Sequence, residues 1–395
     1  MMKQIALLLC VAGVAVSMAS AATVSTVDAR SLSGKVLSLD KTLVLQDAKK
    51  AKTTLPSADV LGIEVQPVKV DAAEQILCRT FSGCDIPCSD IAMKDNLVTL
   101  RTQSVGKSLQ SMPLEAVSVL VFPQVTKTAE DILDRCKVRG YTTGTQDMLV
   151  IERPDGKYQS ATGVLLGITP KVIQFRYKGE DLTMNRSQTR AIFLSRTAAK
   201  PPAPKAYLTT TRGTILALKD VTIADHVRCT LVDGKPYTLP RTDLARVEFL
   251  TDRVKFLSRL TPTKVIEKGL LDVTFPHRVN RCVAGGPILL GGKLYANGLG
   301  LHSFSELQYD VSDGFSTFLA TVGIDDSTEG RGGGTLTILA DEKVLKTLTL
   351  KGGQPPVELR LAVKGAKALT IRVEFGADGL GVGDHLDLAN ARLVK

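Results

Sequence analysis

The sequence predicts an all-β protein in which small antiparallel barrels or meanders are followed by a two-sheet sandwich. Short segments that alternate apolar and polar residues recur along most of the chain, separated by Gly, Asp and Lys turns. A weak repeat occupies residues 30–260, and after residue 275 the strands become longer and their turns richer in glycine. With 395 residues the chain exceeds what one core ordinarily supports, so several domains are expected.

The first residues have the layout of a signal peptide. Lys3 precedes an apolar run over residues 5–16, and Ala19-Ser20-Ala21 supplies small side chains for cleavage after Ala21. Cys10 would suit a lipoprotein signal, but the bulky Leu9 before it favours ordinary cleavage. The run is too short for a membrane span, and no other segment is long and apolar enough. We therefore expect a secreted, periplasmic or cell-surface protein.

One theme of a glycine, a strand, a turn, a second strand and a final β-branched strand repeats in the first two thirds. Three copies align at residues 34–65, 163–194 and 213–249, and a degenerate fourth lies at 91–122. The pattern is typical of SH3-like or Sm-like barrels. Two short helices interrupt it, Asp71 to Cys78 and Thr128 to Cys136, each opening on a capping-box pattern.

The copies, a proline-rich stretch and the change of pattern near residue 260 divide the chain. We expect a signal peptide (1–21), a β-rich module with a cysteine cluster (22–125), a second small β module (126–196), a Pro-rich linker (197–205), a third small β module (206–261) and the C-terminal sandwich (262–395).

Six of the seven cysteines lie beyond the signal peptide, and three of them are closely spaced. In an exported chain this grouping predicts disulfides among Cys78, Cys84, Cys88 and Cys136. Structural zinc is the competing interpretation. It is disfavoured because zinc sites use tighter cysteine pairs, and none of the four histidines lies near the cluster in sequence.

The net charge of +10, from 50 Lys and Arg against 40 Asp and Glu, has several interpretations. Nucleic acid is disfavoured because the cations are dispersed and form no helical stripe or basic-aromatic pattern. An anionic polysaccharide or envelope surface is a better partner for an exported protein. A plain solubilising surface is the favoured explanation of the charge.

The C-terminal strands alternate strictly enough to define one apolar face each. This holds for the segments 307–311, 318–322, 336–340, 344–350 and 369–375. About eight such strands would close a sandwich of two sheets. The pattern places Tyr309, Phe318 and Phe375 in the core.

Three blocks in this region resemble the NPCBM family of carbohydrate-binding modules. They are the glycine-rich 291–303 ending in Gly300-Leu301-His302-Ser303, the segment 318–326, and 384–393 with its Asp-x-x-Asp and Ala-Asn-Ala elements. The resemblance implies a galactose-binding-like jelly-roll β-sandwich that meets glycans at loops on one end, with a structural calcium in some members. Leu388 stands where the family usually has Trp, and the chain contains no Trp.

The resemblance also implies site residues. The ligand-binding candidates are Tyr295, His302, Ser303, Arg331 and His385. His302 would serve either as a ligand contact or as a hydrogen bonder that fixes its loop.

Three carboxylates could serve a cation. Asp325, Asp326 and Asp384 would suit Ca²⁺, which prefers oxygen ligands, while loop capping by Asx turns is the alternative for the first two. No other cofactor is expected.

No catalytic residue is predicted. The chain lacks a Gly-x-Ser-x-Gly elbow, a Walker loop, an HExxH helix and a dinucleotide fingerprint. We expect an exported non-catalytic protein that binds a glycan or cell-surface polysaccharide weakly. The alternative is a structural or protein-interaction protein of the cell envelope, with envelope protein partners, whose jelly roll no longer binds sugar.

Overall fold

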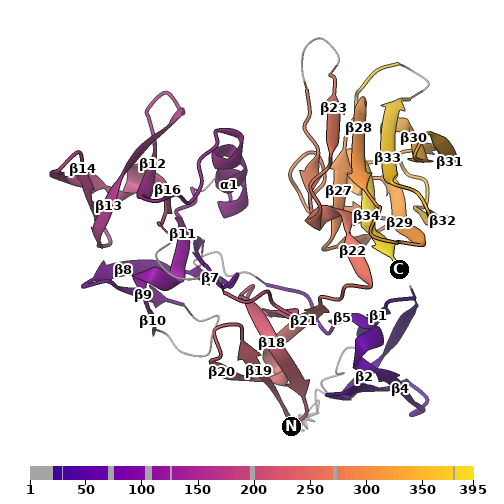
Figure 1. Cartoon of the computed structure of the whole chain (residues 1–395), viewed down its shortest axis with the longest axis horizontal. Coiled ribbons are helices and arrows are strands. Elements are labelled where there is room, and N and C mark those ends of the chain that lie inside the picture. The colour runs from indigo at the N-terminus through magenta and orange to yellow at the C-terminus, as the bar shows by residue number, and fades with distance from the viewer. Residues whose placement is uncertain are drawn as a thin grey trace, which may run out of the picture.

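A computed structural model of the chain describes residues 21–28, 30–69, 75–102, 109–124, 127–195, 201–269, 274–376 and 379–395. Within these ranges the chain is all-β apart from α1 (Ala129–Val138) and short 3-10 turns, which confirms the predicted fold class (Figure 1). The predicted signal peptide lies outside them except for Ala21. No helix in these ranges is long and apolar enough to cross a membrane.

The first two thirds of the chain contain four copies of one small β unit, each with a 3-10 turn before its last strand. Copy one comprises β1 (Ala22–Thr26), β2 (Ser31–Leu39), β3 (Thr42–Gln46), β4 (Lys52–Pro56), η1 (Ser57–Asp59) and β5 (Val60–Glu64). Copy two comprises β6 (Ile76–Thr80), β7 (Asp85–Cys88), β8 (Asp90–Lys94), β9 (Leu97–Arg101), β10 (Leu109–Pro113), η2 (Leu114–Ala116) and β11 (Val117–Val121). The degenerate copy predicted from residue 91 thus begins at Ile76.

The other two copies follow α1. Copy three comprises β12 (Asp147–Glu152), β13 (Tyr158–Ile168), β14 (Val172–Tyr177), β15 (Glu180–Asn185), η3 (Arg186–Gln188) and β16 (Thr189–Phe193). Copy four comprises β17 (Ala206–Thr210), β18 (Ile215–Ile223), β19 (His226–Leu231), β20 (Pro236–Pro240), η4 (Arg241–Asp243) and β21 (Leu244–Phe249).

The second strand is long in three copies, and in each of them it changes register once along its length. The shifts lie at Val36/Ser38 in β2, Leu165/Gly167 in β13 and Leu218/Asp220 in β18. A bulge inserts an extra residue and bends the strand, so one strand can serve both halves of a small barrel. This repeated bend makes the copies barrel-like rather than flat.

The copies associate in pairs through their last strands. Copy one joins copy four where β5 runs antiparallel to β21, with Ile63 opposite Val247, and copy two joins copy three where β11 pairs with β16. Each pair has its own continuous core: one cluster unites buried side chains of copies one and four, and another unites copies two and three. The boundaries drawn within residues 22–261 stay predictions.

One of the two predicted helices is wrong and the other is confirmed. Residues 70–74 lie outside the described ranges, but Ile76–Thr80 forms β6, paired with both β7 and β11. This sheet pairing buries Cys78 completely and overrides the local capping signal. In α1, by contrast, the Thr128 hydroxyl accepts from the Asp131 N–H and the Asp131 carboxylate accepts from the Thr128 N–H.

The C-terminal part is a sandwich of two antiparallel sheets, with a small hairpin beside them. The first sheet contains β22 (Val254–Phe256), β24 (Arg278–Val279), β27 (Gly298–Leu301), β29 (Thr317–Ile324), β32 (Val357–Ala362) and β34 (Leu386–Val394). The second contains β23 (Lys264–Glu267), β28 (Ser305–Asp310), β30 (Gly333–Ala340), β31 (Lys343–Lys351) and β33 (Ala368–Phe375). The hairpin is β25 (Ile288–Leu290) and β26 (Lys293–Tyr295), and short 3-10 turns lie at η5 (Leu257–Arg259) and η6 (Asp326–Thr328).

The sandwich core forms as the alternation predicts, with one exception. Tyr309 and Phe318 are fully buried between the sheets, whereas Phe375, at the last position of β33, is only partly buried. Upstream of residue 262, Val254 already lies opposite Val394 of β34, and Leu257 belongs to the core cluster.

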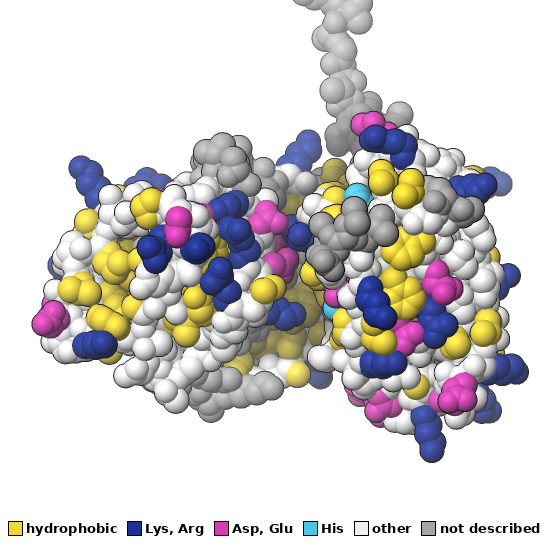
Figure 2. All heavy atoms as spheres, turned by 90° about the horizontal axis from the view of Figure 1, so that it is seen from above, with side chains coloured by type: hydrophobic (Ala, Val, Ile, Leu, Met, Phe, Trp, Pro, Cys, Tyr) yellow, Lys and Arg dark blue, Asp and Glu magenta, His cyan; other side chains and the backbone are white. Residues whose placement is uncertain are grey.

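The sandwich contacts both barrel pairs. Val27 and Leu61 of copy one join Val254 and Phe256 in a small apolar cluster. On the other side, Arg281 of the sandwich makes ion pairs with Glu130 and Asp131 of α1. Lys and Arg side chains are spread over both parts on the face shown in Figure 2, with acidic side chains among them.

Candidate functional site

Two histidines meet at one end of the sandwich because β27 and β34 are neighbours. Leu301 lies opposite Leu386, so the residues that continue these strands, His302 and His385, come to the same edge. Their ring centroids are 5.8 Å apart. On the other side of His302 the ring of Phe275 stacks at 4.4 Å with an interplanar angle of 27°.

His302 and Ser303 hold the loops together and are themselves buried. His302 is 5% exposed, and its Nδ1 donates to the Ser303 carbonyl oxygen at 2.7 Å. The Ser303 hydroxyl donates to Asp384 Oδ2 at 2.5 Å, and the Gly333 N–H donates to Asp384 Oδ1 at 3.1 Å. Of the two roles expected for His302, this geometry favours the loop-fixing one.

A close backbone approach completes this loop arrangement. A Cβ at Gly332, where φ is +76°, would lie 1.9 Å from the Gly383 carbonyl oxygen. Only glycine adopts this positive φ without strain and has no Cβ to clash with the Gly383 oxygen. The loop that carries Arg331 is thereby held against the segment that carries Asp384.

The accessible surface at the loop end of the sandwich, beside His302, is apolar. This patch was not predicted from the sequence. Phe275 is 43% exposed although its ring stacks on His302, and Leu380 and Val382, which flank Gly381 beside His302, are also exposed. Phe275 lies between described strands and belongs to no periodic pattern, so no signal in the sequence would have selected it. Such a patch is available to a ligand.

The remaining candidates border this patch. Arg331 is exposed, donates from Nε to the Thr328 carbonyl oxygen at 3.2 Å and forms an exposed ion pair with Glu329 at 3.6 Å. Burial, and secondarily the nearby His302, lower the pKa of His385, so its ring is neutral at pH 7.

The three aspartates proposed for Ca²⁺ make separate contacts. Asp325 accepts from the N–H groups of Leu289 and Ser327, and Asp326 accepts from those of Gly291 and Gly292. In the described part of the chain no group of three or more His, Cys, Asp or Glu side chains could hold a metal. The contact of Asp325 with the Ser327 N–H is that of the Asx-capping alternative, and the calcium site stays a prediction.

A buried acid pair lies behind these loops. Burial, followed by hydrogen bonding and charge from Asp325, raises the pKa of Asp387 to about 10. No donor in the described residues reaches the Asp387 oxygens, so its own acidic proton, donated to Asp325, supplies the hydrogen bond. Burial opposes ionisation of Asp325, but hydrogen bonds from Asp387, Ser327 and Leu289 hold its pKa below the usual value.

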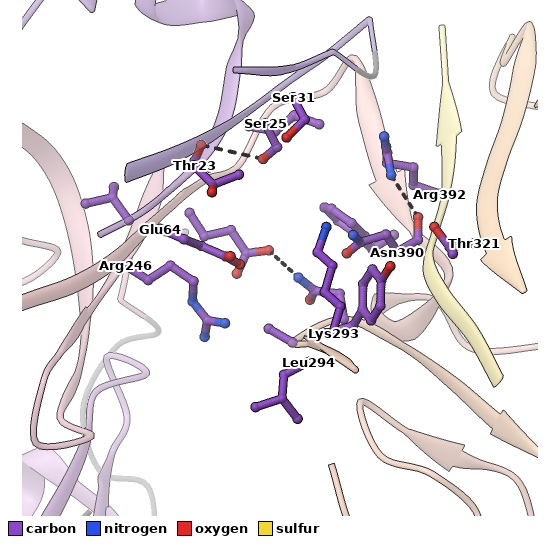
Figure 3. Close-up of a pocket in the computed structure, with 18 of the residues that line it drawn as sticks. Thr23, Ser25, Ser31, Glu64, Arg246, Lys293, Leu294, Thr321, Asn390 and Arg392 are labelled. Carbon is purple, nitrogen blue, oxygen red and sulfur yellow. Dashed lines mark hydrogen bonds between the residues drawn. The ribbon is translucent and has the colours of Figure 1, made fainter. Parts of the chain in front are cut away.

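Tyr295 lies apart from the other candidates. It lines a cavity between the sandwich and the pair formed by copies one and four, shown in Figure 3. Sequence reasoning grouped it with His302 because both belong to one motif, but β27 separates them by the length of a strand.

The cysteines do not form the predicted disulfides in the structure. All six described cysteines are buried, and no disulfide joins any two of them. Cys78 and Cys88 belong to the core of copies two and three, Cys84 to that of copies one and four, and Cys136 to the cluster under α1. The four candidates are thus distributed over three clusters.

A family model extends from β22 to the end of β34. Residues 253–394 match the NPCBM/NEW2 domain. This confirms the resemblance of the C-terminal region, and the match begins upstream of the predicted boundary at 262. We refer to these residues as the NPCBM region.

A comparison with individual proteins finds similarity over part of the chain. A protein of Renibacterium salmoninarum named "Putative endo-alpha-N-acetylgalactosaminidase" is 33% identical over 111 residues, which are 28% of this chain and 7% of that protein. The chain therefore spans a small part of that relative.

Solved structures similar to this chain include carbohydrate-binding modules. A CBM51 module from Clostridium perfringens GH95, solved with methyl-galactose, is 21% identical, covers 36% of this chain and 99% of its own, and has a TM-score of 0.32. Tandem CBM51 modules of a family 98 glycoside hydrolase from Streptococcus pneumoniae are 15% identical, with coverage of 66% and 90% and a TM-score of 0.32.

Proposed function

We propose that this chain is an exported, non-catalytic protein that binds a glycan or cell-surface polysaccharide through the loop end of its NPCBM region. The match of residues 253–394 to a carbohydrate-binding-module family supports the class of ligand. The observation that carries the choice of surface is the exposed Phe275 ring, held in place by stacking on His302 at 4.4 Å. The signal-peptide pattern of residues 1–21 supports export.

The Phe275 surface sets the expected strength of binding. A flat aromatic ring packs on the apolar face of a pyranose, and Arg331 and His385 are near enough to the patch to offer polar contacts. One ring and a few hydrogen bonds exchanged against water support dissociation constants of about a millimolar for a single sugar unit. Useful affinity would come from many contacts along a polymer.

The geometry around Ser303 supports a non-catalytic role. A serine nucleophile needs a histidine that accepts its proton. Here the Ser303 hydroxyl donates to Asp384, and His302 Nδ1 donates to the Ser303 carbonyl oxygen. Ser303 is also buried, so a substrate carbonyl has no access to its oxygen.

Glycan-array screening of the full chain, followed by calorimetry with the retained polymer, tests the proposal. Phe275→Ala should weaken polymer binding by at least about tenfold, the order of one lost stacking contact. Val344→Ala removes an exposed apolar side chain from the distant β31 and should leave binding unchanged. Retained affinity in Phe275→Ala would place the ligand elsewhere.

A structural or protein-interaction role in the cell envelope is the second candidate. The four barrel copies support it, because they form most of the described chain and lie outside the NPCBM match. Absence of any retained glycan at millimolar concentrations would favour this candidate over glycan binding.

A further inference from the structure

A groove lies between the barrel pair of copies two and three and the NPCBM region. It is lined by α1 with the residues that flank this helix, by residues 155–158 at the start of β13, and by residues 276–279 of the NPCBM region. Figure 1 shows α1 on the side of the barrel pair that faces the sandwich. The volume of the groove is about 960 Å³, at the upper end of the range of about 300–1,000 Å³ that is usual for ligand sites.

Ion pairs join the two walls of this groove. Arg278 of the NPCBM region lies 3.7 Å from Asp134 of α1, and Arg281 lies 3.5 Å from Glu130 and 3.3 Å from Asp131. All three carboxylates within α1 therefore have a cationic partner on the opposite wall. An anion that enters the groove meets these carboxylates already neutralised.

The groove retains an excess of positive charge. Its lining contains three Asp side chains against six Lys and Arg side chains, which are Lys127, Arg135, Lys137, Arg139, Lys157 and Arg278. Arg135, Lys137 and Arg139 are exposed and make no ion pair within the described residues. Lys157 shares Asp155 with Arg153, each at 3.9 Å, so one carboxylate serves two cations there.

The helix explains only part of this charge. Cations near a helix C-terminus are favourable by themselves, which accounts for Arg135 and Lys137 in the last turn of α1. Lys157 comes from the β12–β13 turn of copy three, and it lines the same groove. Cations that converge from separate elements indicate a surface for an anion.

The groove also offers apolar surface between its cations. Val138 is 88% exposed and Val279 is 42% exposed, and both belong to the lining. Pro276 directly follows Phe275, so the groove begins beside the Phe275 surface. Because burial of apolar surface is favourable, the C–H faces of sugar rings can pack on these side chains.

A single-stranded nucleic acid suits this lining less well. Its binding depends on aromatic rings on which the bases stack. Tyr158 is the one Phe, Tyr or Trp of the lining, and it is only 5% exposed. Lys127 and Arg135 lie over its ring, at 5.8 Å and 5.2 Å from the centroid. The groove therefore favours an anion built from sugar rings.

We propose that this groove binds a polysaccharide whose sugar units carry carboxylates, a polyuronate. The polymer continues from the Phe275 surface into the groove, where its carboxylates lie along Arg135, Lys137 and Arg139. This assignment rests on the function proposed above, in which the ligand is a polysaccharide, and it adds the charge of that ligand.

Calorimetric titration of the full chain with polygalacturonate tests the groove, with the fully methyl-esterified polymer as a matched neutral probe. The two polymers share one backbone and differ in carboxylate charge. Polygalacturonate should bind at least about tenfold more tightly, because esterification removes several charge-assisted contacts at once. A single-stranded DNA oligonucleotide of the same charge is the third probe, and it should bind more weakly than polygalacturonate.

The double variant Lys137→Gln, Arg139→Gln removes two exposed cations that have no ion pair within the described residues. It should weaken polygalacturonate binding at least about fivefold and leave binding of the esterified polymer unchanged. The matched control is Lys219→Gln, Arg228→Gln, which makes the same charge change at exposed positions of β18 and β19 in copy four. The control should keep nearly full affinity for polygalacturonate.

Equal losses in the two double variants would attribute binding to the net charge of the chain and overturn the proposal. Equal affinity for the two polymers, or tighter binding of the DNA, would overturn it as well. If the two polymers bind equally and Phe275→Ala weakens both, the function proposed above stands and the polyuronate groove does not. If polygalacturonate binding depends on Lys137 and Arg139 but not on Phe275, the groove stands and the Phe275 surface is not the ligand site.

Discussion

The stability of the isolated NPCBM region should depend on the residues just before position 262. Leu257 is 0% exposed and packs in the sandwich core, and β22 adds a strand to the edge of β34. Removing a fully buried leucine costs about 2–5 kcal/mol, and domains of this size are stable by roughly 5–15 kcal/mol. Taking the middle of both ranges, a fragment that begins at 262 should therefore lose about a third of the stability of one that begins at 252.

Urea unfolding of the two fragments, followed by circular dichroism, measures the difference. Val254 and Phe256 are absent from the shorter fragment and have lost their copy-one partners in the longer one, so the expected difference counts only Leu257. Leu257→Ala in the longer fragment should reproduce most of the loss, whereas Val265→Ala, at an exposed position of β23, should cost little. Coincident urea midpoints for the 252 and 262 fragments would refute this account of the boundary.

Three further predictions concern the interior. The pKa of Asp387 is about 10 in the folded chain and near 4 when unfolded, so it stabilises the fold fully below pH 4 and this contribution is lost as pH rises toward 10. Asp387→Asn, which can still donate to Asp325, should raise the urea midpoint at pH 8 more than at pH 4. If Asp387→Asn changed the urea midpoint by the same amount at pH 4 and pH 8, the proposed acid pair of Asp387 and Asp325 would be contradicted. Gly332→Ala should lower stability by more than about 2 kcal/mol in thermal unfolding, whereas Gly365→Ala, with a similar φ and open space, should cost about 1 kcal/mol. Similar losses of stability in the two variants would show that the close approach to Gly383 does not restrict position 332. Finally, thiol titration without reductant should find Cys136 reactive after denaturation and unreactive before it, since the side chain is buried and burial raises the pKa of its thiol to about 11. Mass-spectrometric detection of a bond between Cys78 and Cys88 would restore the sequence prediction.

The strand content of this protein could be predicted from the sequence, but its strand pairing could not. Alternation and turn residues are local signals, and they located the repeats, α1 and most strands of the sandwich. The pairing of Ile63 with Val247 joins segments from opposite ends of the repeat region, and no local pattern encodes it. The predicted helix near Asp71 failed for the same reason, since β6 is stabilised by two neighbours remote from the capping signal.

The candidate site was predicted in part. The motif around His302 and Ser303 was found because glycine-rich loops and paired polar residues are visible in sequence, yet both side chains are buried and support the loops. Phe275 was missed because exposure cannot be read from an isolated aromatic residue between strands. Likewise, Tyr295 was selected by its motif, while Arg246 and Glu64, which line the same cavity, come from the barrel copies.

Copy one pairs with copy four, and copies two and three, which lie between them in sequence, pair with each other. This arrangement imposes an order on folding during synthesis. The outer pair cannot close until β21 has been synthesised, so β5 presents an unpaired edge while the inner copies form. Contacts between segments so far apart raise the contact order and slow folding. An open strand edge invites pairing with other chains during that delay. A chain that ends before residue 244 lacks β21, so the open edge of β5 would never be covered. Such truncated chains should aggregate.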